Sequence, residues 1–129
     1  MSRLLTASWF WTACLCLVSC AAQPEPASLR VMSFNLWHGG DAGGKPVQAS
    51  ADVIRAAGAD LVGLQEVEGR AASQGGPRPD RSVELARQLG FHHKRLAGRN
   101  AVLSRWPIAE VAPGRWGVLV ETPAGTVAL

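Results

Sequence analysis

Two residues with hard oxygen atoms stand where apolar, strand-like segments end. Asn35 directly follows the segment RVMSF, and Glu66 directly follows LVGLQ. In an open α/β sheet, ligands bind beside the carboxyl ends of the strands, so neighbouring strands would bring this amide and this carboxylate together. Magnesium prefers oxygen ligands, keeps several of its waters and often uses only one or two carboxylates. The pair therefore predicts a site for Mg²⁺ or Mn²⁺, which would polarise a phosphoryl oxygen.

Three other polar residues are candidates for contacting a phosphate or for supporting the metal ligands: His38, Gln65 and Asn100. Each has a plainer alternative. His38 is equally typical of a loop histidine without a role, and Gln65 of a side chain that satisfies the local backbone. Turn or strand-edge chemistry accounts equally well for Asn100.

Several basic and aromatic residues invite a functional interpretation that the sequence does not favour. The adjacent His92 and His93 are not expected to bind metal. Trp37, Trp106 and Trp116 are expected to pack in the core or at its rim rather than to stack on bases. Surface charges are usually only solvated, although six basic residues could meet an anionic substrate: Arg78, Arg81, Arg87, Lys94, Arg95 and Arg99.

The elements that must position these residues alternate between strand and helix patterns. Residues 29–37 and 60–67 are typical of strands, and the second is apolar enough to be covered on both faces. Between them, apolar residues at helical spacing run from Pro46 to Gly58 and predict a helix. This order predicts a βαβ-like unit.

The rest of the chain predicts a second helix and a series of short strands. After a loop rich in glycine, proline and serine, Asp80 is placed to cap a helix that Gly90 ends. A turn at 123–125 precedes the last strand. Five strand-like runs follow the helix: 92–97, 100–104, 108–113, 116–121 and 126–129.

Three segments in this order, RVMSFNLWHGG, ADLVGLQEV and GRNAVLSRWPI, resemble the opening motifs of the endonuclease/exonuclease/phosphatase (DNase I-like) family. The resemblance covers residues 29–129. It implies an α/β (α+β) fold, the N-terminal half of a four-layer β-sandwich flanked by helices. It also implies a metal-dependent hydrolase of phosphodiester or phosphomonoester bonds, in which Asn35 and Glu66 take the family's metal-site roles.

The family's later motifs do not occur in these 129 residues. They comprise a catalytic histidine at a strand end, a Gly-Asp-x-Asn segment and a late Asp-His pair. Such groups activate water and support the transition state. We therefore assign no catalytic residue and expect these residues alone to be an inactive fragment, whereas a longer relative would be an enzyme. The final run, 126–129, looks like an unfinished strand.

The first twenty residues have the pattern of an export signal. One charge, Arg3, precedes an apolar run over residues 4–18, and small residues follow it. The run is shorter than the roughly 20 apolar residues that a membrane-spanning helix needs. We expect a signal peptide at 1–19, with a buried N-terminal helix as the alternative.

The segment LVSC, which ends at Cys20, resembles a bacterial lipobox. In a lipobox the cysteine becomes the lipid-modified N-terminus after cleavage. Residues 20–28 then predict a flexible tether broken by prolines, and residues 29–129 predict one folded domain. Ordinary secretory cleavage near Ala22, without a lipid, is the alternative.

Composition narrows the classes of function. The three cysteines stand at positions 14, 16 and 20, so a chain that starts at Cys20 forms no disulfide framework and no zinc-like cluster. A formal net charge of +3 neither demands nor excludes nucleic acid. No Gly-x-Gly-x-x-Gly or phosphate-loop motif follows the first strand, which disfavours a nucleotide-binding domain.

The sequence thus favours an exported phosphoesterase, held by lipid at the bacterial cell envelope and facing the periplasm or the exterior. Its expected partners are the membrane and a phosphate ester; the sequence does not distinguish nucleic acid, phospholipid and small molecules. No oligomer is expected, and a secreted form is the alternative location. The alternative function is a non-catalytic envelope lipoprotein or a binding remnant of the same fold.

Overall fold

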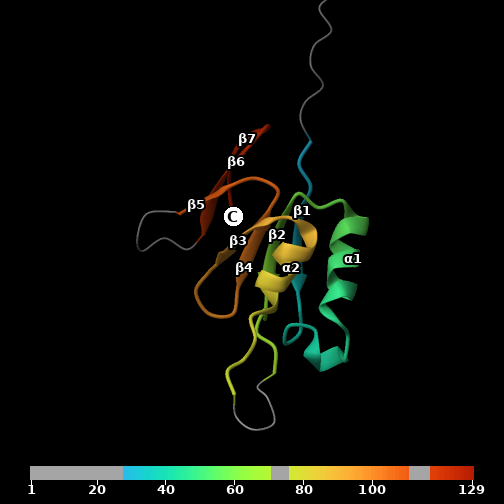
Figure 1. Ribbon diagram of the computed structural model, residues 1–129. Helices are drawn as coiled ribbons and strands as arrows, with labels where there is room; N and C mark the ends of the chain where they lie inside the picture. Colours follow the sequence, from blue (N-terminus) through green and yellow to red (C-terminus); the bar gives the residue numbers. More distant parts are fainter. Residues whose placement is uncertain (1–27, 71–75, 111–116) are drawn as a thin grey trace, which may run out of the picture.

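The computed structural model describes residues 28–70, 76–110 and 117–129 (Figure 1). The expected signal peptide, Cys20 and nearly all of the expected tether lie outside the described residues. Residues 111–116, which include parts of two predicted strands and a tryptophan, lie outside as well. Within the described ranges, no helix is long and apolar enough to cross a membrane.

The predicted strand–helix–strand unit is confirmed. It consists of β1 (Val31–Asn35), α1 (Val47–Ala57) and β2 (Leu61–Gln65). The two strands are parallel neighbours, with Asn35 opposite Gln65. Parallel neighbours need a crossover connection, and α1 provides it.

Both helices end at the glycines that the sequence indicates. α1 follows Pro46 and ends at Gly58, and α2 (Arg81–Leu89) follows Asp80 and ends at Gly90. The two glycines have φ values of 61° and 69°. This left-handed conformation, which glycine adopts without a steric penalty, closes a helix and turns the chain back toward the sheet.

β2 and β4 (Ala101–Ser104) form the centre of a four-stranded sheet with the order β1-β2-β4-β3. β4 runs antiparallel to β2, with Leu64 opposite Ala101. β3 (His92–Arg95) pairs with the outer side of β4. The start of β4 therefore lies beside the end of β2, so the turn before β4 reaches the same edge of the sheet as Glu66.

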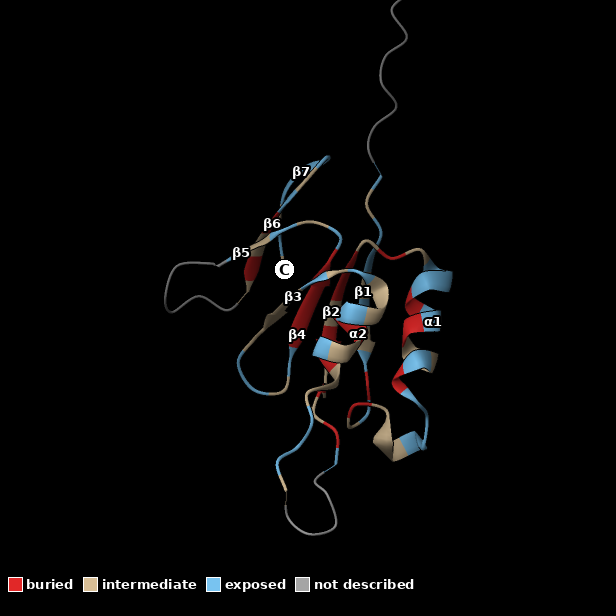
Figure 2. Cartoon of the chain, viewed as in Figure 1, coloured by how far each residue is buried: buried red, intermediate tan, exposed pale blue. Residues whose placement is uncertain are grey.

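α1 and α2 cover one face of this sheet (Figure 2). Ile54 of α1 and Leu85 of α2 belong to one core cluster with Leu64 and Leu103 of the central strands. All four side chains are less than 2% exposed. This core fixes both central strands against the helices.

A second, antiparallel sheet covers the other face. It contains β5 (Ile108–Glu110), β6 (Val118–Thr122) and β7 (Gly125–Ala128). Buried valines of β6 pack with Leu61 and Val102 of the first sheet. The described chain thus stacks helices, a four-stranded sheet and a three-stranded sheet. This mixed α+β architecture confirms the predicted fold class, a partial β-sandwich flanked by helices.

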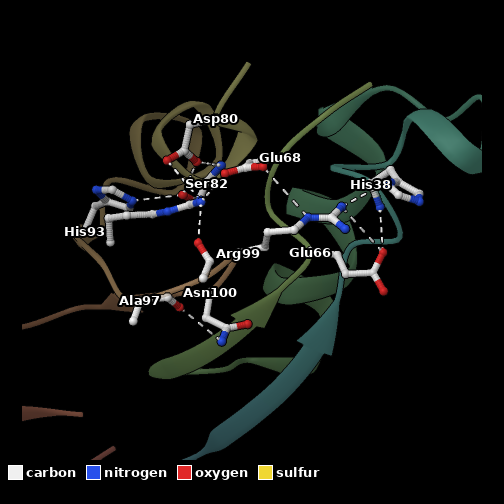
Figure 3. A network of polar contacts seen from close by, with 11 residues as sticks. His38, Glu66, Glu68, Asp80, Ser82, His93, Ala97, Arg99 and Asn100 are labelled. Carbon is white, nitrogen blue, oxygen red and sulfur yellow. Dashed lines mark hydrogen bonds and ion pairs between the residues drawn. The ribbon is translucent and has the colours of Figure 1, made fainter. Parts of the chain in front are cut away.

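The start of α2 is tied to β3 by a cluster around the buried hydroxyl of Ser82 (Figure 3). The carboxylate of Asp80 accepts a 3.0 Å hydrogen bond from the backbone N–H of Ser82 and also contacts its hydroxyl. That hydroxyl lies 2.9 Å from Nε2 of His93. Arg95 lies 3.3 Å from Asp80. The helix cap predicted at Asp80 is confirmed, and it also joins the helix to the sheet.

Lowering the pH below about 6.5 is expected to reduce the free energy of unfolding through His93. Burial lowers the pKa of His93 from its ordinary value of 6.5, with Asp80 opposing this shift and Arg95 adding to it. As the pH falls through 6.5, the unfolded state therefore binds the proton before the folded state does, and stability declines. Urea denaturation between about pH 5 and pH 7 measures the effect, in a window above the ordinary carboxylate pKa values.

The control for this prediction compares two neighbouring histidines. His93→Gln is expected to flatten the pH dependence, whereas His92→Gln, which changes an exposed side chain, is expected to retain it. An unchanged slope in His93→Gln would contradict the prediction.

Candidate metal site

Asn35 and Glu66 meet at the carboxyl end of the parallel pair β1–β2. Nδ2 of Asn35 donates a 3.2 Å hydrogen bond to Oε1 of Glu66. β1 ends at Asn35 and β2 ends one residue before Glu66, so the parallel register sets the two residues side by side. The structure therefore has the convergence on which the sequence argument depended. Their role as metal ligands stays a prediction.

Three non-glycine residues at this edge have positive φ: Trp37 (49°), His38 (58°) and Glu66 (54°). The described residues contain no other non-glycine residue with positive φ. Such conformations cost on the order of 1–3 kcal/mol each and persist where surrounding contacts over-determine them. Strain of this kind gathers at functional sites, so it singles out this edge of the sheet.

Hydrogen bonds hold the strained turn against the carboxylate. Oδ1 of Asn35 accepts from the backbone N–H of Trp37 at 2.7 Å. Oε2 of Glu66 accepts from the backbone N–H of His38 at 3.2 Å, and the Glu66 carbonyl accepts from Gly39 at 2.8 Å. Glu66 is thus fixed through both its side chain and its main chain.

Gly39 has a position that only glycine fits. Its φ is 64°, and a Cβ there would lie 2.5 Å from Cγ of Arg81 and 3.0 Å from the backbone nitrogen of Gly69. The turn after β1 therefore packs directly against the start of α2 and the segment after β2. A side chain at this position would push the turn away from Glu66.

A guanidinium group lies beside the same carboxylate (Figure 3). Nη2 of Arg99 is 3.9 Å from Oε2 of Glu66 and 2.8 Å from Nδ1 of His38. The hydrogen bond from Asn35 is the largest cause that holds the pKa of Glu66 below its ordinary value. The backbone N–H of His38 and the charge of Arg99 act in the same direction, and partial burial opposes them. Glu66 is therefore ionised at neutral pH, the state that binds cations.

Of the three supporting candidates, His38 donates a backbone hydrogen bond to Glu66, whereas the side-chain amides of Gln65 and Asn100 have other partners. Gln65 donates to a hydroxyl on β1 and to a carbonyl of its own strand. Asn100 donates to the carbonyl three residues before it, within a turn. No hydrogen bond in the described structure joins either amide to Glu66. The contact of Gln65 with its own strand and the turn contact of Asn100 fit the plainer alternatives, whereas the contact of Gln65 with the Ser33 hydroxyl joins β2 to β1. A role of either amide in contacting phosphate stays a prediction.

The other histidines and tryptophans that the structure describes lie away from the carboxylate or at its rim. His92 is exposed, and His93 belongs to the cap of α2. Trp37 is 61% exposed, so it stands at the rim and not in the core. Trp106 is partly buried against the second core cluster. Trp116 lies outside the described residues.

Glu68 was not among the residues that the sequence indicated, and Arg99 was only one of six basic residues that could meet an anionic substrate. Arg99 comes two residues before β4, and its carbonyl accepts a 3.0 Å hydrogen bond from the N–H of Val67, just after β2. Glu68 lies 2.6 Å from Nη2 of Arg95 and 3.9 Å from Nε of Arg99. The antiparallel pairing of β2 with β4, had it been predicted, would have placed both residues near Glu66, because such a pairing brings the start of one strand to the end of the other.

The donors at this edge suit only some metal ions. They are one charged carboxylate and one amide oxygen, which already accepts a hydrogen bond. Across the described residues, no group of three or more His, Cys, Asp or Glu side chains is arranged to hold a metal. The pair therefore fits Mg²⁺ or Mn²⁺ that keeps most of its waters, and it does not fit a closed structural zinc site.

An open hollow of about 720 Å³ lies beside the start of α1 and is separate from this site. Neither Asn35 nor Glu66 lines it. Its two carboxylates are paired with Arg81, at 3.3 Å from Asp41 and 3.4 Å from Glu84. We therefore place the candidate metal site at the strand ends and not in the hollow.

Comparison with known proteins places the chain in a family. The model of the Endonuclease/Exonuclease/phosphatase family matches residues 32–125, a range that includes Asn35, Glu66 and Arg99. The chain belongs to this family. Members act as phosphoesterases and generally use divalent metals. No curated protein and no solved structure gives a significant match.

Proposed function

We propose that these residues belong to a divalent-metal-dependent phosphoesterase, which hydrolyses phosphodiester or phosphomonoester bonds, and that Asn35 and Glu66 hold the metal. One observation carries the proposal: an ionised carboxylate fixed by Asn35 and His38 at the ligand-binding edge of a parallel strand pair. Family membership supports the class of reaction. The alcohol part of the substrate stays unspecified among nucleic acid, phospholipid and small molecules.

Each residue of the pair has a separate task in this proposal. Glu66 supplies the charged ligand, and the hydrogen bond from Asn35 sets the direction of its carboxylate. The amide oxygen of Asn35 has a second lone pair beyond the one that Trp37 uses. When bound, Mg²⁺ or Mn²⁺ would polarise a phosphoryl oxygen and offset the charge on the leaving group.

Glu66→Gln is expected to lower the affinity of the protein for Mn²⁺ by more than about tenfold, because it removes the charged ligand. Asn35→Ala is expected to lower it by about tenfold, because the Glu66 carboxylate loses the hydrogen bond that orients it. Titration calorimetry on the full chain measures both. Asp52→Asn, which removes an exposed carboxylate on α1, is the matched control. Loss of affinity in the control equal to that in Glu66→Gln would refute the assignment.

With Mg²⁺, these 129 residues alone are expected to hydrolyse neither p-nitrophenyl phosphate nor bis-p-nitrophenyl phosphate above the buffer rate. The reason is that the family's later histidine and aspartate motifs do not occur in the sequence, and metal stabilisation alone is too little for turnover. Turnover by residues 20–129 that disappears in Glu66→Gln would overturn this expectation while supporting the proposed function. A chain that binds no divalent metal would favour the non-catalytic alternative.

We further propose that the protein is exported to the bacterial cell envelope and anchored there by a lipid on Cys20. The support is the pattern of residues 1–28. Metabolic labelling with an alkyne fatty acid is expected to label the wild type and Cys16→Ala equally and to leave Cys20→Ala unlabelled. Equal labelling of Cys20→Ala would end the lipid proposal.

A further inference from the structure

Arg99 is not committed to a structural ion pair. Its contacts to the carboxylates of Glu66 and Glu68 are both 3.9 Å, longer than the roughly 2.7–2.9 Å of a charge-assisted hydrogen bond. Glu68 already has a partner, since Nη2 of Arg95 lies 2.6 Å from it. The Nε atom of Arg99 is buried and has no hydrogen-bond partner in the part of the chain that the structure describes. Among the described residues, His38 is thus the only hydrogen-bond partner of this guanidinium.

One hydrogen bond holds the guanidinium at the site. Nη2 of Arg99 lies 2.8 Å from Nδ1 of His38. Arginine only donates, so Nδ1 of His38 is the acceptor and the imidazole proton lies on Nε2. The backbone N–H of the same histidine donates to Glu66. His38 thus keeps the guanidinium next to the carboxylate without neutralising its charge.

Charge then indicates what binds between these groups. Glu66 and Glu68 both offset the charge of Arg99 from 3.9 Å, and Glu68 also pairs with Arg95. A divalent cation on Glu66 would leave two positive centres side by side. Such an arrangement repels itself unless an anion bridges it. A phosphoryl group suits that place, because its oxygens can contact a metal and also accept parallel hydrogen bonds from a planar guanidinium.

We propose that Arg99 is a phosphate-binding residue of this site, that it contacts a non-bridging oxygen of the phosphate ester, and that His38 is its positioning residue. The inference rests on the proposed function, since it takes the metal at Glu66 as given. It adds to that function a residue outside the predicted pair, drawn from the turn before β4.

The test separates metal binding from phosphate binding. Mn²⁺ affinity is measured by calorimetry on the full chain, and inorganic phosphate is the second probe. Phosphate binding is followed by the ³¹P relaxation that protein-bound Mn²⁺ enhances, with Mn²⁺ kept below the protein concentration. Arg99→Gln is expected to weaken phosphate binding to the Mn²⁺-loaded protein by about tenfold or more. Its Mn²⁺ affinity is expected to be equal to or above that of the wild type, because a positive charge beside Glu66 is gone.

Two further variants make the result specific. Arg87→Gln removes the same charge from an exposed position in the last turn of α2, and it is expected to leave both affinities unchanged. Arg99→Lys keeps the charge without the planar fork, and it is expected to restore part of the phosphate affinity.

The possible failures are distinguishable. Unchanged phosphate affinity in Arg99→Gln overturns the inference. A parallel loss of Mn²⁺ and phosphate affinity together with a lower melting temperature also overturns it, because Arg99 then only supports the fold. In both cases Mn²⁺ binding by the wild type still supports the proposed metal site. An equal loss of phosphate affinity in Arg87→Gln would mean that the effect comes from the overall charge of the protein, and it also overturns the inference. A wild-type chain that binds no Mn²⁺ overturns the proposed function and this inference with it.

Discussion

The parallel pairing of β1 with β2 is the constraint on which the whole candidate site depends. Side chains alternate between the two faces of a strand, so a shift of one residue in the pairing register would move the Asn35 side chain to the opposite face of the sheet. The register is held because α1 crosses over the sheet and buries Ala51 and Ile54 against it. Apolar packing therefore sets the 3.2 Å contact between the Asn35 amide and the Glu66 carboxylate, although none of the packed residues carries chemistry.

The strained turn at the strand ends relies on the same packing. β2 and β4 are covered by helices on one face and by the second sheet on the other, with Leu64 in one core cluster and Leu61 in the other. Strands covered on both faces cannot relax easily, because cores are close-packed. Among the described non-glycine residues, left-handed conformations occur only at Trp37, His38 and Glu66, just beyond the ends of β1 and β2. The chain thus has a rigid support and a turn in which the N–H groups of His38 and Gly39 donate to Glu66 and that of Trp37 donates to Asn35.

A chain of alternating charges connects this turn to the start of α2 (Figure 3). It runs from Glu66 through Arg99, Glu68 and Arg95 to Asp80. These side chains are all about one-third exposed, and ion pairs of that kind contribute little stability. Their effect is to orient neighbours. Arg95 forms the close ion pair with Glu68, and the contacts of Arg99 with Glu66 and Glu68 stay longer, at 3.9 Å.

By itself, the sequence determined the features that depend on residues close together along the chain. Hydrophobic spacing, Asp80 as a cap, and the glycines at 58 and 90 located the elements, and the strand ends identified Asn35 and Glu66. Tertiary structure alone decided that Gln65 and Asn100 turn to the local backbone, that Ser82 meets His93, and that Arg99 reaches the carboxylate. The physical reason is that these contacts depend on the pairing of distant strands and on left-handed turn conformations. Local propensity encodes neither of them.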